Sequence, residues 1–287
     1  MPELPEVETV RLQLLRKVAG KTIASVEVFH SKTVAHDETI EDTLLGKTIA
    51  AIDRIGKLLI FSFKHEDDVF VLAHFKMTGQ FFFVAGDGET IGGGHSMTAA
   101  DRDLPGKHTR LAMHFTDHST LYFNDMRLFG YVKAATAAEV TKVRGGFGPE
   151  PIAADFDCDW FGAKLKTRKT SIKAVLLDQT FIAGLGNIYV DEALWRAQIR
   201  PTRRADSVTK AEATRLCRAA GDVMNESIAV GGTTFQHFKD TGGQNGNFTD
   251  YLKVFGKQGT SCPRCGAAIK KIRVAGRGTH YCPGCQK

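Results

Sequence analysis

The stretch "KLLIFSFKHEDDVFVLAHFKM" (residues 57–77) contains two short apolar runs on either side of a charged turn. Short apolar runs bounded by turn signals predict neighbouring β-strands. Several such strands in sequence favour an antiparallel sandwich or barrel. The predicted strands are residues 22–30, 47–55, 57–64, 68–77, 79–85, 109–115, 119–125 and 130–135.

A helix is predicted before these strands, at residues 5–19. Gly20 follows it as a stop signal, and four apolar residues fall on one face at helical spacing. They are Val7, Val10, Leu14 and Val18.

A glycine- and proline-rich segment, "RGGFGPEPIAADF" (residues 144–156), follows the strands and is typical of a linker. Helices are predicted after it at residues 159–167, 170–178, 187–196, 209–227 and 233–238. The fold class is therefore α+β, with an N-terminal β-sandwich domain, a C-terminal helical domain and a cysteine-rich hairpin. The predicted boundaries are 1–135 for the sandwich, 136–157 for the linker, 158–245 for the helical domain and 246–287 for the hairpin domain.

Four of the six cysteines form the pattern C-x2-C-x16-C-x2-C, namely Cys262, Cys265, Cys282 and Cys285. Each C-x2-C turn can direct two thiolates at one tetrahedral ion, so the pattern predicts one structural Zn²⁺ in a zinc finger. Disulfide pairing is the alternative, but disulfides rarely persist in the cytoplasm, where we expect this chain. Cys158 and Cys217 stand alone and are expected to be small buried residues or free thiols.

The net charge is +6 and the pI is about 9.0. Basic residues concentrate in "KLKTRKTSIK" (164–173) and in residues 251–287, which contain eight Lys or Arg and no acidic residue. Such blocks favour nucleic acid over membrane, because no amphipathic apolar face accompanies them. The sequence has no apolar run of transmembrane length and no secretion signal, so we expect a cytoplasmic protein.

The N-terminus "MPELPEVETV" (residues 1–10) allows two interpretations. In the first, Pro5 and Glu8 simply suit the first turns of a helix. In the second, removal of the initiator methionine exposes the secondary amine of Pro2, and an α-amino pKa of about 7.7–8.0 leaves part of it neutral. A neutral amine can form a Schiff base with an aldehyde-like carbon, while Glu3 moves protons. The residues alone favour the first interpretation.

Several further motifs follow in order along nearly the whole chain: "GKLL" (56–59), "HFKMTG" (74–79), "DMRLFG" (125–130), "GLGNIYVDEALW" (184–195), "GGTTF" (231–235) and the cysteine pattern. Together with the N-terminal block, they resemble the bacterial formamidopyrimidine-DNA glycosylases (Fpg), base-excision repair enzymes for oxidised purines. The start "PELPE" separates this family from endonuclease VIII, its pyrimidine-directed relative, whose start resembles "PEGPE". The resemblance makes the reactive terminus the favoured interpretation.

The resemblance implies a catalytic group of four residues. Pro2 would attack C1′ of the damaged nucleotide, expel the base and form an imine with the opened sugar. Glu3 would act as general acid and base, and Glu6 would hold the site together. Lys57, otherwise read as a solvated charge in a turn, would reach a phosphate near the amine. Successive β- and δ-elimination would leave a one-nucleotide gap, without a catalytic metal or cofactor.

The resemblance also implies a DNA-binding surface with a helix-two-turn-helix. Met77, Arg127 and Phe129 would fill the space left by the flipped nucleotide, with Arg127 bonding to the opposite base, usually cytosine. Composition alone would instead place the Met and the Phe in a core, and the same alternative applies to His74. The other implied DNA contacts are His74, His108, Lys173, Asn187 and Arg277.

Two positions depart from the family block D-P-R-R-F-G, because this chain has Met126 and Leu128 in place of the Pro and the second basic residue. A leucine cannot bind phosphate, so one electrostatic anchor is expected to be missing. Residues 238–248 correspond to the loop that caps the extruded purine. The enlarged loop 85–106 is interpreted as a solvated insertion rather than a partner contact.

We therefore predict a bifunctional DNA glycosylase and AP lyase for oxidised purines such as 8-oxoguanine and formamidopyrimidines. The partner would be damaged double-stranded DNA, and we expect a monomer in the bacterial cytoplasm, associated with the nucleoid. The alternatives are an endonuclease VIII-like enzyme for oxidised pyrimidines and a catalytically silent lesion-binding protein. The intact Pro2, Glu3 and Lys57 argue against the silent protein.

Overall fold

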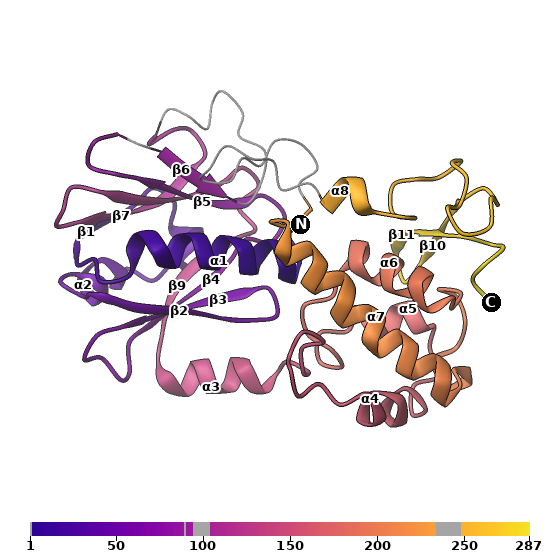
Figure 1. Cartoon of the computed structure of the whole chain (residues 1–287). Helices are drawn as coiled ribbons and strands as arrows, with labels where there is room; N and C mark the ends of the chain where they lie inside the picture. The colour runs from indigo at the N-terminus through magenta and orange to yellow at the C-terminus, as the bar shows by residue number, and fades with distance from the viewer. Residues whose placement is uncertain (1, 89, 94–103, 234–247) are drawn as a thin grey trace. The chain divides into compact units, whose positions relative to one another are not determined.

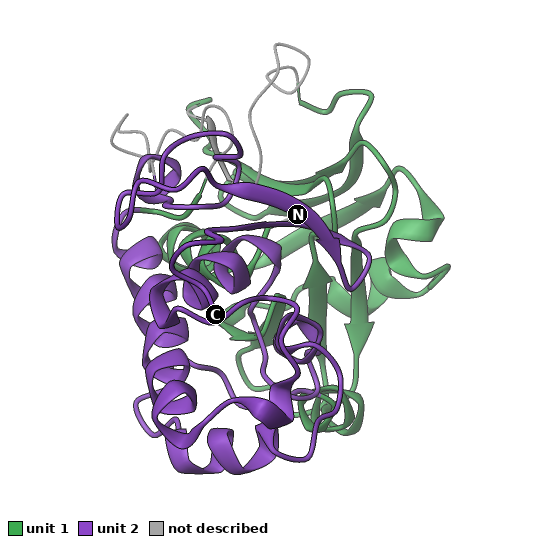
Figure 2. Ribbon diagram, turned by 90° about the vertical axis from the view of Figure 1, so that its right-hand side faces the viewer, with its two compact units in different colours: residues 1–146, 231–247 green, residues 147–230, 248–287 purple. Residues whose placement is uncertain are grey.

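The computed structural model describes residues 2–88, 90–93, 104–233 and 248–287 (Figure 1). The chain forms two compact units, shown in different colours in Figure 2. Unit 1 comprises residues 1–146 and 231–247, and unit 2 comprises residues 147–230 and 248–287. The predicted strands fall in the first unit, and the helices predicted at 159–167, 170–178, 187–196 and 209–227 fall in the second. Thr233, the first residue of the helix predicted at 233–238, belongs to the first unit.

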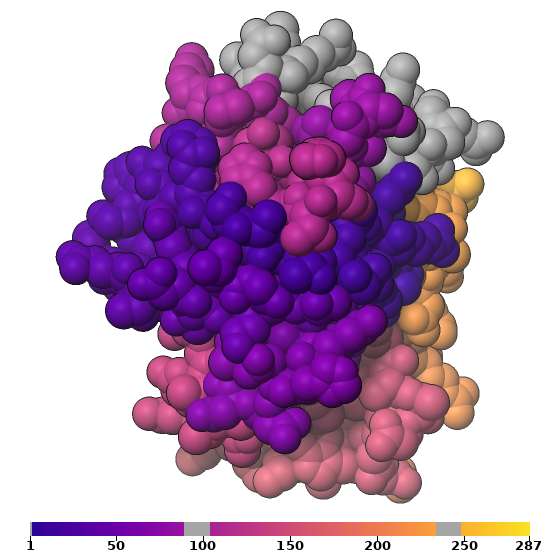
Figure 3. All heavy atoms as spheres, turned by 90° about the vertical axis from the view of Figure 1, so that its left-hand side faces the viewer, coloured from indigo at the N-terminus to yellow at the C-terminus, as the bar shows by residue number. Residues whose placement is uncertain are grey.

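Unit 1 is an antiparallel β-sandwich, as the sequence predicts, and β6 is the one unexpected strand in the part of the unit that the structure describes. One sheet has the order β1 (Ile23–Val28), β7 (Thr109–Phe115), β8 (Thr120–Asp125), β5 (Gly79–Val84) and β6 (Thr90–Gly93). The other has the order β2 (Ile49–Ile55), β3 (Leu58–Phe63), β4 (Phe70–His74) and β9 (Tyr131–Ala135). Indigo residues from the start of the chain therefore lie beside magenta residues from beyond residue 100 on the surface (Figure 3).

The sandwich core is built from alternate residues of the two sheets. Leu59, Phe61 and Phe63 of β3 all enter the main core cluster, because every second side chain of a strand points to the same face. The ring of Phe61 lies 5.9 Å from that of Phe81 in β5, so the two sheets meet through aromatic contacts. Helix α1 (Leu4–Val18) adds its predicted apolar face to this core through Val7, Val10, Leu14 and Val18.

Among the described residues of unit 1, three short helices were not expected: η1 (Ser31–Val34), α2 (Ile40–Leu44) and α3 (Ala137–Gly145). Helix α3 lies in the segment predicted as linker. It begins with a capping box, in which the Thr136 side chain accepts from Glu139 N–H and the Glu139 side chain accepts from Thr136 N–H. Only Val140 of α3 is buried, against Leu58 and Ile60, so the helix carries almost no apolar periodicity to detect.

Unit 2 combines helices with a two-stranded hairpin. Its helical elements are α4 (Cys158–Leu165), α5 (Ile172–Leu177), α6 (Asn187–Ala197), η3 (Ala205–Ser207), α7 (Lys210–Ala229) and α8 (Phe248–Tyr251). The hairpin is formed by β10 (Lys270–Val274) and β11 (Arg277–Tyr281). The helix predicted at 233–238 lies outside the described residues, apart from its first position. Within the described part of the chain, no helix is both long and apolar enough to cross a bilayer.

Cys217 is buried, as one of the two expectations held, but the expectation of free thiols at Cys158 and Cys217 was wrong. They form a disulfide between α4 and α7, with their Cα atoms 5.6 Å apart, so neither is a free thiol in this structure. The pairing was missed because the two residues are separated by 59 positions and carry no motif spacing. Only the packing of α4 against α7 brings them together.

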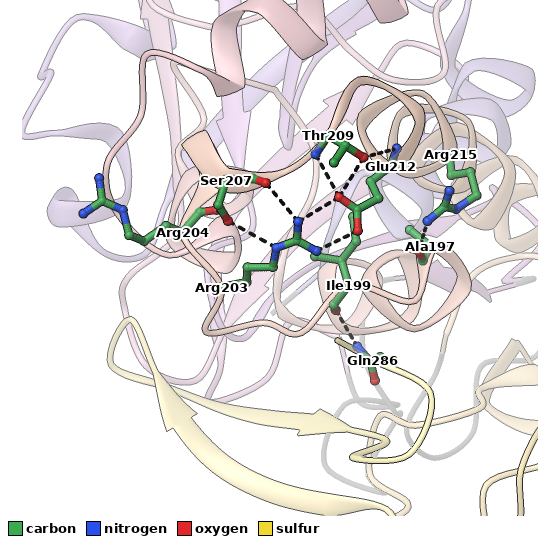
Figure 4. Close-up of polar contacts among 9 residues, drawn as sticks. All are labelled: Ala197, Ile199, Arg203, Arg204, Ser207, Thr209, Glu212, Arg215 and Gln286. Carbon is green, nitrogen blue, oxygen red and sulfur yellow. Dashed lines mark hydrogen bonds and ion pairs between the residues drawn. The ribbon is translucent and has the colours of Figure 1, made fainter.

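The start of α7 is held by one bidentate ion pair (Figure 4). Arg203 donates from both terminal nitrogens to Glu212, at 2.7 and 2.8 Å, and also to the carbonyl of Ser207. Glu212 simultaneously closes a capping box with Thr209. The hydrogen bond from Arg203 is the main reason that the pKa of Glu212 falls from 4.5 to about 2.

Replacing Glu212 with glutamine should lower the free energy of unfolding at pH 7 by roughly 1–2 kcal/mol, because the variant loses the ion pair and weakens the cap. A carboxylate with a depressed pKa in the folded state stabilises above its unfolded pKa. The wild-type advantage should therefore shrink as the pH falls from 4.5 towards about 2. Urea titrations across this range measure it. The matched control is Glu226→Gln, whose more exposed pair with Arg196 should contribute less than about 0.5 kcal/mol.

Candidate functional site

The N-terminal residues are buried and held in place by Glu6. Pro2 is buried, and Glu3 is only 3% exposed. The Glu3 N–H donates to Oε2 of Glu6 at 2.8 Å, while Oε1 of Glu6 accepts from both the N–H and the hydroxyl of Thr233 at 2.7 Å. Gly232 lies directly against this carboxylate, since a Cβ there would be 3.2 Å from Oε1. Glu6 thus connects the chain end to a segment more than two hundred residues away.

Lys57 and His74 lie close together on the second sheet. Lys57 follows Gly56, whose φ of +57° makes the tight β2–β3 turn, and its side chain is buried at 6% exposure. The next residue, Leu58, pairs with His74 in β4. Burial, reinforced by the charges of Lys76 and Lys57, lowers the pKa of His74 to about 3. His74 is therefore neutral near pH 7 and accepts the Lys76 N–H at Nδ1, so it can meet a phosphate only as an uncharged donor.

A salt-bridge network missed by the sequence analysis fixes α1 beside this turn. Glu8 binds Arg11 at 2.6 Å and Arg54 at 2.9 Å, and Arg54 also donates to the carbonyl of Gly56 at 3.0 Å. Burial alone would raise the pKa of Glu8, but the hydrogen bonds from Arg11 and Arg54 lower it overall. The i,i+3 spacing of Glu8 and Arg11 could have been noticed, whereas nothing in the sequence marks Arg54 as their partner.

The residues expected to enter DNA lie on two loops of unit 1, and their side chains reach solvent. Met77 is 36% exposed and Phe129 is 49% exposed, so neither is the core residue that composition alone would suggest. The guanidinium of Arg127 lies 4.7 Å from the centre of the Phe129 ring. His108 is half-buried before β7, and its Nδ1 has no hydrogen-bond partner among the described residues.

The two residues that depart from the family block lie in the same loop as Phe129. Met126 is 59% exposed, which makes it another large apolar side chain on this surface. Leu128 has a φ of +56°, a left-handed conformation that is unusual for a residue without a special turn role. Neither residue offers a charge to a phosphate.

In unit 2, α6 holds the tip of the hairpin. Asn187 is the first residue of α6 and donates through Nδ2 to the carbonyl of Gly278 at 2.9 Å. Asp191, one turn later, accepts the His280 N–H at 2.7 Å. Arg277 is exposed at the start of β11, directly after a turn in which Ala275 and Gly276 both have positive φ.

Lys173 does not have the geometry expected of a DNA contact. Its side chain is fully buried, and its Nζ lies 2.6 Å from Oδ1 of Asp191, which is also fully buried. A phosphate contact would require this pair to open. The structure therefore supports a role for Lys173 in fixing α5 to α6, and Asp191 is a structural residue that the sequence analysis missed.

The four cysteines of the zinc pattern converge at the base of the hairpin. Their sulfur atoms all lie within 4.8 Å of one another, including 3.8 Å between Cys262 and Cys285 and 3.4 Å between Cys265 and Cys282. Four thiolates at about 2.3 Å from a tetrahedral Zn²⁺ would be about 3.8 Å apart, so the donor set fits this ion. The close approach of Gly284 leaves no room for a Cβ, which would lie 2.9 Å from the Cys265 sulfur.

The cysteine cluster is supported by α6. Trp195 packs against Cys262 and Cys282 and donates its indole N–H to the Cys262 sulfur at 3.5 Å. The guanidinium of Arg264 covers the Trp195 ring at 4.2 Å and donates to the Trp195 carbonyl. Such outer contacts orient metal ligands, so the site has the support that a structural zinc needs. Zn²⁺ would supply folding energy here, with all four ligand positions taken by the protein.

The chain has a buried Pro-Glu start, a β-sandwich, a helical unit and a four-cysteine hairpin, and domains of zinc-finger DNA glycosylases match these parts. The formamidopyrimidine-DNA glycosylase N-terminal domain matches residues 1–132, its H2TH domain matches residues 147–239, and the zinc finger found in FPG and IleRS matches residues 261–287. The chain belongs to the formamidopyrimidine-DNA glycosylase family, whose members act on damaged DNA.

Known relatives are similar over their whole length. The formamidopyrimidine-DNA glycosylase of Lactobacillus delbrueckii is 40% identical, with all of both chains covered, and that of Enterococcus faecalis is 40% identical, with all of this chain and 98% of the relative covered. Among solved structures, Lactococcus lactis Fpg with abasic-site DNA has a TM-score of 0.87 at 37% identity, with 99% of each chain covered. A MutM complex with DNA containing carbocyclic 8-oxo-G has a TM-score of 0.85 at 37% identity, with full coverage of both.

Proposed function

We propose that this DNA glycosylase removes oxidised purines through a Schiff base on Pro2 and then cleaves the DNA strand as an AP lyase. The observation that carries the proposal is the fixed N-terminus. Pro2 and Glu3 are buried, and hydrogen bonds to the Glu6 carboxylate from Glu3 and Thr233 hold this end of the chain. A chain end would otherwise fray, whereas nucleophilic attack requires a fixed geometry.

In the proposed reaction, the neutral nitrogen of Pro2 forms a bond to C1′ and gives up its proton, while the bond from C1′ to the base breaks and the base leaves with the electron pair and a proton. Glu3 protonates the sugar ring oxygen, the ring opens, and the nitrogen becomes an iminium. The iminium makes a C2′ proton acidic, so the 3′ phosphate leaves by β-elimination and the 5′ phosphate follows by δ-elimination. Water then releases the enzyme. Each step needs only proton transfer and an amine, and the structural zinc takes no part in it.

The damaged nucleotide must leave the stack before Pro2 can reach C1′. Met77, Arg127 and Phe129 are exposed on two loops of one unit, where they can occupy the vacated space. Apolar side chains commonly support DNA in this way, and Arg127 can donate to the base left without a partner. Solved complexes of relatives contain DNA with Fapy-dG or carbocyclic 8-oxo-G, which supports oxidised purines as substrates.

Borohydride reduction of the enzyme mixed with an 8-oxoguanine:C duplex tests the proposal. The expected result is a covalent adduct that peptide mass spectrometry assigns to Pro2, with a weaker adduct for Pro2→Gly. Excision from a thymine-glycol duplex should be slower, and a preference for it would favour the pyrimidine-directed alternative. Absence of an adduct, an adduct on a lysine side chain or retention of Met1 on the active protein would refute the mechanism.

Leu128 gives a separate test of the DNA-binding surface. The substitution Leu128→Arg should restore one phosphate contact, tighten binding several-fold at low salt and steepen the logarithmic salt dependence by about one unit. Fluorescence anisotropy with a duplex that contains a stable abasic analogue, measured over a range of salt concentrations, gives this slope. The control Leu128→Gln has similar size without charge, and an equal slope for both variants would place position 128 away from the phosphates.

A further inference from the structure

Two loops of unit 1 carry the side chains that we propose to enter DNA. The first, residues 75–79, connects β4 to β5 and presents Met77. The second, residues 125–130, connects β8 to β9 and presents Arg127 and Phe129. These side chains must fill one gap in a base stack, so the two loops need a fixed spacing.

One buried carboxylate binds both loops. Asp125 is fully buried at the end of β8, and its Oδ1 accepts the Thr78 hydroxyl and, at 3.1 Å, the Arg127 N–H. Its Oδ2 accepts the Gly130 N–H at 2.7 Å. The Thr78 hydroxyl in turn accepts from the Arg127 N–H at 3.1 Å, so Thr78 bridges the loops directly.

Asp125 itself is fixed by the sheet. Its N–H donates to the carbonyl of His108 at 2.9 Å, and its carbonyl accepts from Nε of Arg110 at 2.7 Å. It also lies opposite Gly79 in the β5–β8 pairing, at the point where the first loop joins the sheet. The carboxylate therefore belongs to the rigid sandwich, while the groups that it binds belong to the two loops.

The C-terminal end of each loop leaves little room for adjustment. A Cβ on Gly130 would lie 3.1 Å from Oδ2 of Asp125 and 2.9 Å from the Phe123 ring. In the first loop, a Cβ on Gly79 would lie 2.6 Å from the carbonyl of Phe75. The loops are thus packed onto the end of the sheet, and a shift at Asp125 passes directly to Arg127 and Phe129.

We propose that Asp125, together with the Thr78 hydroxyl, is a positioning residue that sets discrimination between the bases opposite the lesion. This inference rests on the proposed function, in which Met77, Arg127 and Phe129 enter the DNA. Arg127 distinguishes cytosine from adenine by hydrogen-bond geometry, so its backbone must be fixed to a fraction of an ångström. A carboxylate suits this task because both of its oxygens accept hydrogen bonds and each of the three partner groups donates one.

The substitution Asp125→Asn keeps the size of the side chain but introduces two N–H donors. Whichever way the amide turns, its nitrogen faces either the Gly130 N–H or the donors of Thr78 and Arg127. Thr78→Val removes the bridging hydroxyl with little change of shape, while Thr78→Ser retains it. The matched control is Asp117→Asn, because Asp117 similarly accepts the Ser119 N–H and hydroxyl but lies in the β7–β8 turn.

The experiment measures single-turnover excision from 8-oxoguanine:C and 8-oxoguanine:A duplexes, with borohydride trapping on a single-stranded abasic oligonucleotide. Asp125→Asn should reduce the C-over-A rate ratio by about tenfold, as expected for loss of one charge-assisted hydrogen bond. Trapping on the single strand needs no inserted side chains and should stay within about threefold of wild type. Thr78→Val should reduce the ratio by a smaller factor, while Thr78→Ser and Asp117→Asn should leave it unchanged.

An unchanged C-over-A ratio in Thr78→Val would overturn the inference, and so would an equal loss on every substrate in Asp125→Asn, which indicates a purely structural role. If Asp125→Asn does not fold, the comparison of Thr78→Val with Thr78→Ser decides the question alone. Absence of an adduct in the wild type would instead refute the proposed function. The two failures are therefore distinguishable.

Discussion

Replacing Glu6 with glutamine is expected to lower the single-turnover rate of base excision by roughly 10²-fold or more. Both oxygens of Glu6 accept hydrogen bonds, from Glu3 on one side and from Thr233 on the other. A glutamine amide can accept on only one side, so its nitrogen must oppose an N–H donor on the other. The clash displaces either the residue next to Pro2 or the segment that holds it, and the amine loses its alignment with C1′.

The measurement is excision from an 8-oxoguanine:C duplex with enzyme in excess, together with the unfolding temperature of each variant. Thr233→Ser keeps both donors to Glu6 and should remain close to wild type, whereas Thr233→Val loses the hydroxyl and should be slower by about tenfold. A rate for Glu6→Gln within threefold of wild type would show that Glu6 does not position the amine. The same conclusion would follow if the unfolded fraction of Glu6→Gln alone accounted for its lower excision rate.

Much of the fold could be predicted because the relevant signals are local. The apolar runs of β3 and β4, the apolar face of α1 and the cysteine spacing each lie within a few residues to a few tens of residues. Periodicity fails where an element contributes little to a core, as in α3, which buries only Val140. The sequence therefore identifies the long, periodic elements and misses the short ones, including α2, although Ile40 and Leu44 of α2 are fully buried.

In the candidate site, too, local motifs could be recognised in the sequence, whereas contacts between distant residues could not. Motif resemblance predicts Pro2, Glu3 and Glu6 as site residues, but it does not reveal that Glu6 is bound to Thr233, because that contact joins distant parts of the chain. The family resemblance implied that Lys173 contacts DNA, which would require an accessible side chain. Its pairing with Asp191 became visible only when both side chains were seen to be buried.

Asp125 shows most clearly which contacts cannot be predicted from the sequence. It stands in the family-like block "DMRLFG", where attention falls on the exposed residues that follow it. Its importance comes from three donors contributed by two loops, and no sequence pattern encodes that convergence. The disulfide between Cys158 and Cys217 is another case, since residue spacing alone cannot give a pairing.

Removal of the zinc is expected to lower the affinity for damaged DNA by roughly 10²- to 10³-fold. The segment around the cysteines has a small core, formed by Trp195, Val254 and Ile269 with the ligands Cys262 and Cys282. Binding of a structural Zn²⁺ contributes on the order of 10 kcal/mol in comparable modules, so the metal-free hairpin should unfold. The phosphate contact that we expect from Arg277 would then be lost together with the hairpin.

The variant Cys282→Ser and treatment with a strong chelator both test this expectation. Metal analysis should find one zinc per wild-type chain and none in either treated sample, and fluorescence anisotropy should show the loss of DNA affinity. Cys217→Ser, outside the metal cluster, should retain the zinc. A Cys282→Ser protein that keeps wild-type affinity without zinc would contradict the expectation.

Arg277→Ala separates the role of the metal from that of the hairpin tip. This variant should keep its zinc, because Arg277 lies at the β10–β11 turn and is not a ligand. It should weaken DNA binding less than Cys282→Ser does and flatten the logarithmic salt dependence by about one unit, as expected for one phosphate contact. If its loss of affinity equals that of Cys282→Ser, the zinc acts through Arg277 alone. If the loss of affinity in Arg277→Ala is smaller, the folded hairpin also positions the DNA contact expected of Asn187 in α6, because Asn187 is bound to the carbonyl of Gly278 beside Arg277.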